Sequence, residues 1–232
     1  MQVTEAIILA GGLGTRLKEA VPDLPKCMAP VNGRPFIAYV TDQLLEQGIE
    51  KLIFSLGYRS DAFLSFLANA FPASSYDVVI EKEPLGTGGA IQLACRHAKG
   101  KQVVALNGDS IFKMDLAQQV ALHLQQDADC TLALKYLENF DRYGAVMLNP
   151  DQSIASFSEK KFYPAGYMSC GVYVLNRENF LAEGLPERFS FETDYLQASH
   201  HQRKLYGLPQ DGYFIDIGIP EDYRKAQTEL KN

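Results

Sequence analysis

Cysteine is scarce in this sequence, and its spacing predicts neither a disulfide bridge nor a metal site. The four cysteines, Cys27, Cys95, Cys130 and Cys170, are widely separated and include no C-x-x-C pair. This pattern argues against a disulfide scaffold and a zinc site, and it favours a reducing, cytoplasmic environment. The four histidines form no recognisable ligand pattern, and we interpret them as ordinary residues.

Long apolar runs and clusters of basic residues are also missing. No stretch approaches the roughly 18 consecutive apolar residues of a membrane span, and the run at residues 6–10 is too short for a signal peptide. The net charge of −6 comes without any Lys/Arg run. We therefore expect no nucleic acid and no membrane as partner, and any cations that bind phosphate must act locally.

What is present is an alternation of short apolar runs with amphipathic stretches. Runs at residues 6–10, 51–57, 76–83 and 101–109 read as strands, and residues 35–47, 60–71, 90–98 and 115–127 read as helices. Glycines at 86–89 are expected to form a turn before the third helix. This alternation predicts an α/β fold with a Rossmann-like, mixed but mainly parallel central sheet flanked by helices.

The alternation of predicted strands and helices ends near residue 130. Several β-rich segments follow, partly antiparallel, with strands at 203–209 and 213–218 and helical pieces at roughly 191–200 and 220–230. No linker, repeat or low-complexity tract interrupts the chain. We therefore expect a single domain over residues 1–232, with a nucleotide-binding half at about 1–128 and an acceptor-binding half at about 129–232.

A glycine loop, GGLGTR at residues 11–16, follows the first strand directly. Backbone N–H groups in such a loop can point at an anion at the carboxyl edge of the sheet. The P-loop pattern fails because Thr15 and Arg16 follow Gly14, and the dinucleotide fingerprint fails because Leu17 stands at its last glycine position. The remaining interpretation is a phosphate loop whose own Arg16 clamps a nucleoside triphosphate.

Lys26 lies in the extended segment LPKCMAPV, between Pro25 and Pro30. A lone lysine is usually a solvated surface charge. Together with Arg16, however, Lys26 fits phosphoryl transfer, in which catalysis consists mostly of positioning and charge neutralisation.

Carboxylates at strand ends suggest two further roles. Glu81, in EKEPLGTGGA, suits a base better than a phosphate, and the paired N1–H and N2–H donors of guanine favour GTP over UTP or CTP. Asp109 in LNGDS and Asp216 in FIDIGIPEDY end two separate strands. If the fold brings them together, they can hold Mg²⁺ with the help of substrate phosphates. Glu159 and Lys160 in FSEKK suit the hydroxyls and phosphate of a phosphorylated sugar.

In order along the chain, LAGGLGTRL, PKCMAPV, EKEPLGTGGA, NGDS, RYGAV, FSEKK, SCGVY and DIGIPEDY resemble the sugar-1-phosphate nucleotidyltransferases over essentially the whole length. Within that family the sequence is most similar to the D-glycero-α-D-manno-heptose 1-phosphate guanylyltransferases of bacteria, with mannose-1-phosphate guanylyltransferases next. The C-terminal β-helix of some members is absent from the sequence. The resemblance implies a cytoplasmic enzyme of surface-glycan synthesis that uses GTP (or another NTP), a sugar 1-phosphate and Mg²⁺, and it leaves homo-oligomer formation open.

The resemblance also implies roles for individual residues. Arg16, Lys26 and Asp109 would be catalytic, and Asp109 and Asp216 would bind the metal. The nucleotide would contact Leu9, Ala10, Gly11, Gly12, Gly14, Thr15, Arg16, Glu81, Gly86, Thr87 and Gly88. The sugar phosphate would contact Lys26, Gly144, Glu159, Lys160 and Ser169. Ser169 stands where the family usually has asparagine, in Asn-x-Gly-x-Tyr.

Three alternatives remain open from the sequence. The first is another acceptor or donor: mannose 1-phosphate with GTP, or glucose or hexosamine 1-phosphate with UTP or CTP. The second is a regulatory homologue that binds nucleotide-sugar without turnover, although Arg16, Lys26, Asp109 and Asp216 are all present. The third is a molybdopterin or isoprenoid-precursor nucleotidyltransferase, which FSEKK and DIGIPEDY disfavour.

Overall fold

The computed structural model describes residues 3–12, 24–57, 60–198 and 200–230. The described strands are β1 (Glu5–Leu9), β2 (Pro30–Val31), β3 (Arg34–Pro35), β4 (Lys51–Leu56), β5 (Tyr76–Ile80), β6 (Gln102–Asn107), β7 (Ser110–Phe112), β8 (Cys130–Phe140), β9 (Ala145–Leu148), β10 (Ile154–Phe157), β11 (Tyr163–Asn176), β12 (Leu205–Pro209) and β13 (Phe214–Asp216). The described helices are η2 (Lys26–Met28), α1 (Phe36–Glu46), α2 (Ser60–Ala70), η3 (Ala73–Ser75), α3 (Gly86–Cys95), α4 (Leu116–Gln125), α5 (Arg177–Ala182), η4 (Phe191–Gln197) and α6 (Pro220–Glu229).

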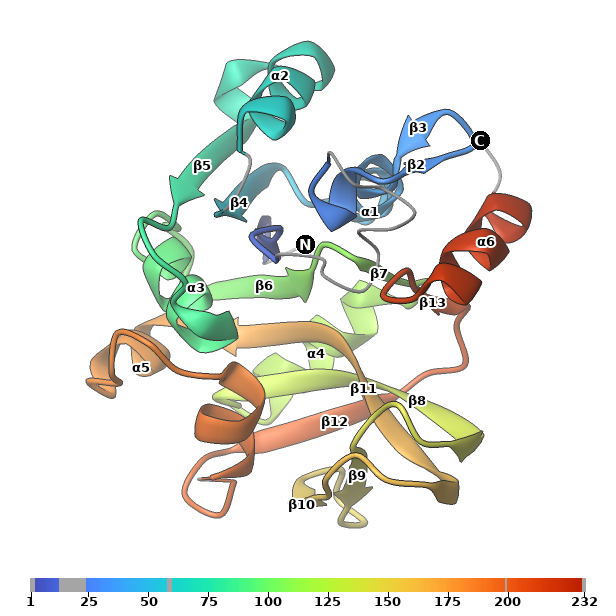
Figure 1. Ribbon diagram of the computed structural model, residues 1–232. Coiled ribbons are helices and arrows are strands. Elements are labelled where there is room, and N and C mark those ends of the chain that lie inside the picture. The colour runs from blue at the N-terminus through green and yellow to red at the C-terminus, as the bar shows by residue number, and fades with distance from the viewer. Residues whose placement is uncertain (1–2, 13–23, 58–59, 199, 231–232) are drawn as a thin grey trace.

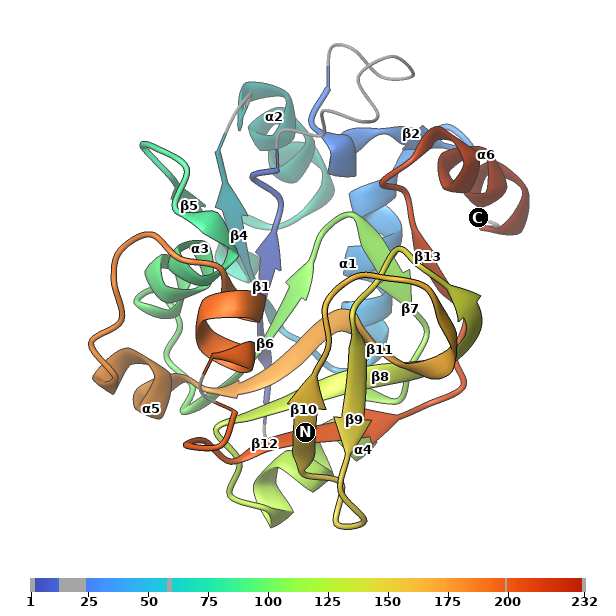
Figure 2. The same ribbon diagram turned by 60° about the horizontal axis from the view of Figure 1, so that its bottom comes forward.

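A central sheet runs through the described part of the chain in the order β10-β9-β11-β6-β1-β4-β5, and β8 and β12 extend it beyond β11. Strands β6, β1, β4 and β5 are parallel, whereas β11 joins β6 in antiparallel orientation. The parallel strands therefore end at one edge, toward the same side of the molecule (Figure 2). The predicted mixed, mainly parallel sheet is confirmed.

Helices cover both faces of this sheet (Figure 1). Successive residues of β1 show why. Ile8 packs into a core cluster that includes Phe54 and side chains of α1, α2 and α4, while Ile7 packs into a second cluster with Ile53 and side chains of α3 and α5. Alternate residues of a strand point to opposite faces, so a continuous apolar run indicates a strand buried on both sides.

The β-rich second half is built around the long strand β11. Its residues pair with β8 along most of their length, with β9 at Tyr167 and Met168, and with β6 from Val172 onward. The register shifts between Ser169 and Tyr173, where Gly171 has a φ of 71°. A bulge that needs a left-handed residue favours glycine. This single strand therefore joins the two halves of the sheet.

Several element boundaries differ from the expectation. Helix α3 begins at Gly86, so the glycines expected to form a turn before the helix lie in its first turn. The short strand β7, the helix α5 and the β2–β3 hairpin were not anticipated. The hairpin turns through Asn32 and Gly33, with φ values of 48° and 80°, as a two-residue turn requires. None of the helices in the described ranges combines the length and apolar character of a membrane-crossing helix.

His123 on α4 is fully buried, and its burial predicts a pH dependence of stability. Its ring nitrogens lie 3.0 Å from the Thr131 hydroxyl and 2.9 Å from the Gln102 side-chain oxygen. Burial lowers its pKa from 6.5 to about 4, against the smaller opposing effects of Asp129 and Asp127. The folded state therefore holds this imidazole neutral at a pH where the unfolded chain already binds a proton.

We expect acidification from pH 6.5 to pH 4 to lower the free energy of unfolding through His123 by about 3 kcal/mol. In this pH range the unfolded state binds more protons than the folded state, so the free energy of unfolding rises with pH. The stability lost through His123 is regained above about pH 6.5. Urea unfolding of the protein and of His123→Gln at several pH values measures the effect. In His123→Gln, the free energy of unfolding should lose the part of its pH dependence that comes from this imidazole. His97→Gln, at an exposed position, should keep the full pH dependence. Equal slopes in all three proteins would contradict the assignment.

Candidate active site

The side chains of Lys26, Asp109 and Asp216 meet at the carboxyl edge of the parallel strands. The Lys26 ammonium lies 2.6 Å from Asp109 Oδ2 and 3.2 Å from Asp216 Oδ1. Only 12% of the lysine side chain is exposed, against 37% for Asp109 and 23% for Asp216. A nearly buried ammonium between two accessible carboxylates is a concentrated set of charges that solvent can still reach.

Local structure explains how such distant residues come together. Asp109 lies in the turn between β6 and β7, and Asp216 ends β13, which pairs with β7 so that Asp216 lies opposite Ser110. The N–H of Ile217 donates to the Asp109 carbonyl at 3.1 Å. Lys26 begins the short helix η2, directly after the extended residue Pro25. The β7–β13 pairing therefore sets the spacing of the two carboxylates.

Gly218 lies in close contact with this charge cluster, and the sequence analysis did not single it out. Its N–H donates to Asp216 Oδ1 at 2.7 Å. A Cβ atom at this position would lie 2.9 Å from Asp216 Oδ1 and 3.1 Å from the Lys26 ammonium. The glycine therefore lets the backbone approach and orient the carboxylate.

Arg142 and Asp222 extend the cluster and were also missed. The Arg142 guanidinium forms an ion pair with Asp222 and lies 3.8 Å from Asp216 Oδ2. Desolvation, the largest single influence, lowers the pKa of Arg142, but the hydrogen bond to Asp222 and the neighbouring charges together raise it above its usual value. Arg142 precedes Tyr143 and Gly144 in the RYGAV stretch, which is the signal for this residue in the sequence. The described cluster thus contains two cations and three carboxylates.

The two aspartates of this cluster suit a divalent cation. Two carboxylates that solvent reaches, together with phosphate oxygens of a substrate, are what Mg²⁺ prefers. Among the described residues no group of three or more His, Cys, Asp or Glu side chains has a metal-binding arrangement. As two carboxylates, Asp109 and Asp216 fit a metal that substrate oxygens complete, and they fit it only when the Lys26 ammonium leaves the space between them.

On the nucleotide side, the structure places Glu81 beside the end of β1. Its Oε2 accepts from the Leu85 N–H at 3.1 Å, and its Oε1 accepts from the Ser55 hydroxyl at 3.3 Å. A Cβ on Gly11 would lie 2.9 Å from Glu81 Oε1. The two bonds hold the carboxylate next to Gly11 while leaving lone pairs for another donor.

The rest of the predicted nucleotide loop is only partly described. Leu9 ends β1 and its carbonyl accepts from the Gly108 N–H at 2.9 Å, and the Ala10 N–H donates to the Ser55 carbonyl at 2.9 Å. Gly12 is exposed, and a Cβ added there would meet no atom of the described residues within 4 Å. Gly14, Thr15 and Arg16 lie outside the described residues.

The first turn of α3 contacts the segment before η4. Gly86 has a φ of 73°, and a Cβ there would lie 2.5 Å from the Phe189 carbonyl; a Cβ on Gly88 would clash with the Phe189 ring. The Gly88 N–H donates to the Phe189 carbonyl at 3.0 Å. Packing therefore accounts for Gly88, which is buried, whereas Thr87 is half-buried and Gly86 exposed.

On the acceptor side the predicted residues lie around the β9, β10 and β11 strands. A Cβ on Gly144 would lie 2.5 Å from the Ser158 carbonyl, so glycine is required for this close approach. Glu159 and Lys160 are exposed, and within the described ranges neither side chain forms a hydrogen bond or ion pair. Ser169 is half-buried at the β11 bulge.

The buried cysteines are poor nucleophiles in the folded protein. All four are free and buried. Burial, and next the Asp109 charge, raise the pKa of Cys27 to about 12, and burial raises the pKa of Cys95 to about 12. The thiolate is the reactive form, so Cys27 does not supply a nucleophile despite its position beside Lys26.

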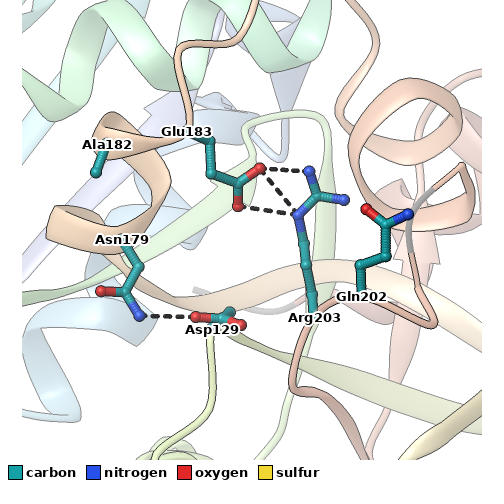
Figure 3. Close-up of a pocket in the computed structure, with 6 residues that line it drawn as sticks. All are labelled: Asp129, Asn179, Ala182, Glu183, Gln202 and Arg203. Atoms are coloured by element: carbon teal, nitrogen blue, oxygen red, sulfur yellow. Dashed lines mark hydrogen bonds and ion pairs between the residues drawn. The ribbon is translucent and has the colours of Figure 1, made fainter.

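A separate pocket of about 440 Å³ lies at the far end of β8, lined by Asp129, Asn179, Ala182, Glu183, Gln202 and Arg203 (Figure 3). Its charged groups already bind one another. Arg203 Nε donates to both oxygens of Glu183, and Asn179 donates to Asp129 at 2.7 Å (Figure 3). The Arg203 guanidinium that lines this pocket is therefore already paired with a carboxylate.

Comparison with known proteins agrees with this placement. The nucleotidyl transferase family profile matches residues 5–232. The D-glycero-alpha-D-manno-heptose 1-phosphate guanylyltransferase of Aneurinibacillus thermoaerophilus is 46% identical, covering 98% of this chain and 99% of the relative. The corresponding protein of Campylobacter jejuni is 42% identical, covering 94% and 96%.

A solved structure is similar throughout. The crystal structure of HddC from Yersinia pseudotuberculosis, also solved in complex with GMP-PN, superimposes with a TM-score of 0.88 at 35% identity, covering 99% of this chain and 100% of that one. Family profile, full-length relatives and fold agree: this chain belongs to the nucleotidyl transferase family.

Proposed function

We propose that this chain transfers GMP from GTP to a sugar 1-phosphate, with D-glycero-α-D-manno-heptose 1-phosphate as the acceptor, releasing pyrophosphate and GDP-sugar. The observation that carries the proposal is the meeting of Lys26, Asp109 and Asp216 at the sheet edge. The full-length identity to two heptose 1-phosphate guanylyltransferases supports the choice of acceptor and donor.

The reaction requires the acceptor phosphate oxygen to attack the α-phosphorus of GTP in line with the departing pyrophosphate. A phosphate monoester is largely ionised at neutral pH, so the oxygen needs no general base. The protein's task is alignment and charge neutralisation. Lys26 is well placed for this task because it is the nearly buried cation at the strand tips, and Arg142 adds positive charge on the acceptor side.

We propose Asp109 and Asp216 as ligands of Mg²⁺. When bound, the ion would neutralise the charge of the phosphates. The Gly218 N–H and Arg142 hold Asp216 from two sides, so that carboxylate keeps its orientation when Lys26 turns to the substrate. The remaining predicted contacts, with Arg16 on the pyrophosphate and Gly11, Gly12, Gly14 and Thr15 on the triphosphate, belong to this proposal.

Glu81 is proposed to read the base, and it supplies a prediction. Glu81→Gln should lower kcat/KM for GTP about ten- to a hundredfold relative to ATP and UTP, because an amide offers one acceptor oxygen to the two guanine donors. The amide can still accept from Leu85, so the fold should persist. Steady-state assays of pyrophosphate release with each nucleotide measure the ratio. An unchanged nucleotide preference would refute the role.

The proposed function is tested by a substrate matrix. Heptose 1-phosphate and mannose 1-phosphate, each with GTP, UTP, CTP and ATP, are assayed for pyrophosphate release, and the nucleotide-sugar is identified by mass spectrometry. The proposal requires the highest kcat/KM with GTP and the heptose. Mannose 1-phosphate as the best acceptor would keep guanylyl transfer and replace the sugar. No turnover with any pair, while GTP still binds, would favour a regulatory homologue.

A further inference from the structure

Glu192, in the first turn of η4, is a carboxylate surrounded by hydroxyl groups. Its Oε2 accepts from the Thr87 hydroxyl at 2.7 Å and from the Ser190 hydroxyl at 3.3 Å, and its Oε1 accepts from the Tyr173 hydroxyl at 3.4 Å. Within the described ranges no lysine, arginine or histidine forms an ion pair with it. A half-buried carboxylate loses part of its hydration, and without a cation partner no ion pair offsets this cost in free energy. The presence of a charged group at this position therefore suggests a role other than stability.

The hydroxyl partners of Glu192 come from both halves of the protein. Thr87 belongs to α3 and accepts from the Phe191 N–H at 2.9 Å, whereas Tyr173 belongs to β11. Ser169 lies four residues before Tyr173 on β11, and its hydroxyl accepts from the Gly171 N–H at 3.4 Å. Burial, and next the Glu192 charge, raise the pKa of Tyr173 well above its usual value, which keeps that hydroxyl protonated. A chain of hydrogen bonds thus runs from Thr87 through Glu192 to Tyr173, and Ser169 lies on the same strand as Tyr173.

Both ends of this chain border the candidate active site. At one end, Gly171 beside Ser169 packs so closely on Asn107 that a Cβ would lie 2.4 Å from its side-chain nitrogen. Asn107 ends β6, two residues before Asp109. At the other end, Thr87 follows the turn that Glu81 holds through Leu85. The polar chain therefore lies between the Asp109 strand tip and the Glu81 turn, where η4 packs against α3 and Tyr173 of β11 contacts Glu192.

We propose that Glu192 determines acceptor specificity by accepting a hydrogen bond from a sugar hydroxyl, with the hydroxyls of Thr87 and Ser169 nearby. This inference rests on the proposed function. A carboxylate repels phosphates, so the phosphate end of the acceptor lies toward Lys26 and Arg142, and the hydroxyl-bearing ring lies toward Glu192. Two carboxylate oxygens offer about four acceptor positions, of which the protein uses three. The half-buried Thr87 and Ser169 supply hydroxyls that can donate or accept.

Glu192→Gln is the central test, because the amide keeps the size of the side chain and can still accept from Thr87. We expect KM for the sugar 1-phosphate to rise at least about tenfold, since a hydrogen bond to a charged acceptor is the strong kind. KM for GTP should stay within about twofold. Ser169→Ala should act in the same direction with a smaller effect of about threefold. Asp194→Asn, which removes an exposed charge from the same helix, is the matched control and should change neither constant.

A second readout separates this inference from the function on which it rests. Calorimetry with mannose 1-phosphate in the presence of GDP measures sugar binding without turnover. Weaker binding by Glu192→Gln, with the thermal midpoint and GDP affinity of the unmodified protein, supports the assignment. Unchanged sugar binding, or a lower midpoint with both affinities reduced alike, would overturn it. Sugar binding by the unmodified protein without any turnover would count against the proposed reaction and leave the Glu192 comparison valid.

Discussion

Lys26→Ala is expected to lower turnover about a thousandfold while making the site bind a divalent cation more tightly in the absence of nucleotide. The loss of turnover follows because one preorganised charge at the reacting phosphate is worth a factor of roughly a hundred to a thousand or more. The gain in cation affinity follows because the ammonium now lies between Asp109 and Asp216, at 2.6 and 3.2 Å. Its removal leaves two carboxylates with one fewer positive neighbour.

Two measurements on the same variant check this prediction. Steady-state assays give the fall in kcat, and titration with Mn²⁺ in the absence of nucleotide, followed by electron paramagnetic resonance, gives the affinity. We expect Mn²⁺ to bind at least about tenfold more tightly to Lys26→Ala. Lys51→Ala is the matched control, because Lys51 forms an ion pair with Asp77, with 3.0 Å between their charged atoms, and this pair lies outside the site. Turnover near that of the unmodified protein would contradict the role of Lys26, and weaker Mn²⁺ binding would contradict the competition.

Asp109→Asn is expected to reduce turnover at least about a hundredfold and to weaken Mn²⁺ binding, the opposite effect on the metal from Lys26→Ala. The amide has nearly the size of the carboxylate but lacks its charge, and Mg²⁺ and Mn²⁺ prefer anionic oxygen ligands. The Asp109 carbonyl still accepts from the Ile217 N–H, so the backbone contact between the β6–β7 turn and β13 should remain.

The same assays, together with a thermal melt, test Asp109→Asn. Its melting temperature should stay within a few degrees of that of the unmodified protein, because the residue is more than a third exposed. Asp42→Asn is the control, since Asp42 forms an ion pair with Arg34, with 2.6 Å between their charged atoms, and this pair lies outside the site. If Asp109→Asn bound Mn²⁺ as tightly as the unmodified protein, Asp109 would not be a metal ligand.

These two variants separate two roles that activity alone would confuse. Lys26 and the carboxylates lie in one cluster, so either substitution should abolish most turnover. The sign of the change in metal affinity differs because one substitution removes positive charge and the other removes negative charge. If the affinity for Mn²⁺ rose in both variants, or fell in both, Asp109 and Asp216 would not form the proposed metal site.

Short-range patterns were sufficient for much of the fold. The apolar runs at residues 6–10 and 51–57 correspond to β1 and β4, and the period of the apolar residues at 35–47 corresponds to α1. The predicted start of α3 was wrong because glycines usually end or interrupt helices. Here they begin one, since only glycine allows the close packing on Phe189. That contact joins segments about a hundred residues apart, and no local pattern reports it.

The candidate site shows the same division. Glycine- and proline-rich stretches made Lys26 a candidate, and strand ends made Asp109 and Asp216 candidates. Asp109 follows the parallel strand β6, whereas Asp216 is placed by the antiparallel pairing of β13 with β7. Arg142, Asp222, Gly218 and Glu192 were missed. Each acquires its position from a partner far away in the sequence, such as Asp216 for Arg142 or Thr87 for Glu192.

By itself, the sequence determined the class of the fold, the alternation of strands and helices in the first half, and the side chains that can handle phosphate and metal. These properties depend on hydrophobic period, turn chemistry and side-chain type, all of which are local. Only the tertiary structure decided that the Lys26 ammonium lies between two aspartates and that Glu192 joins α3 to β11. Those contacts depend on the antiparallel pairing of β7 with β13 and on the bulge of β11, which arise from packing between distant segments.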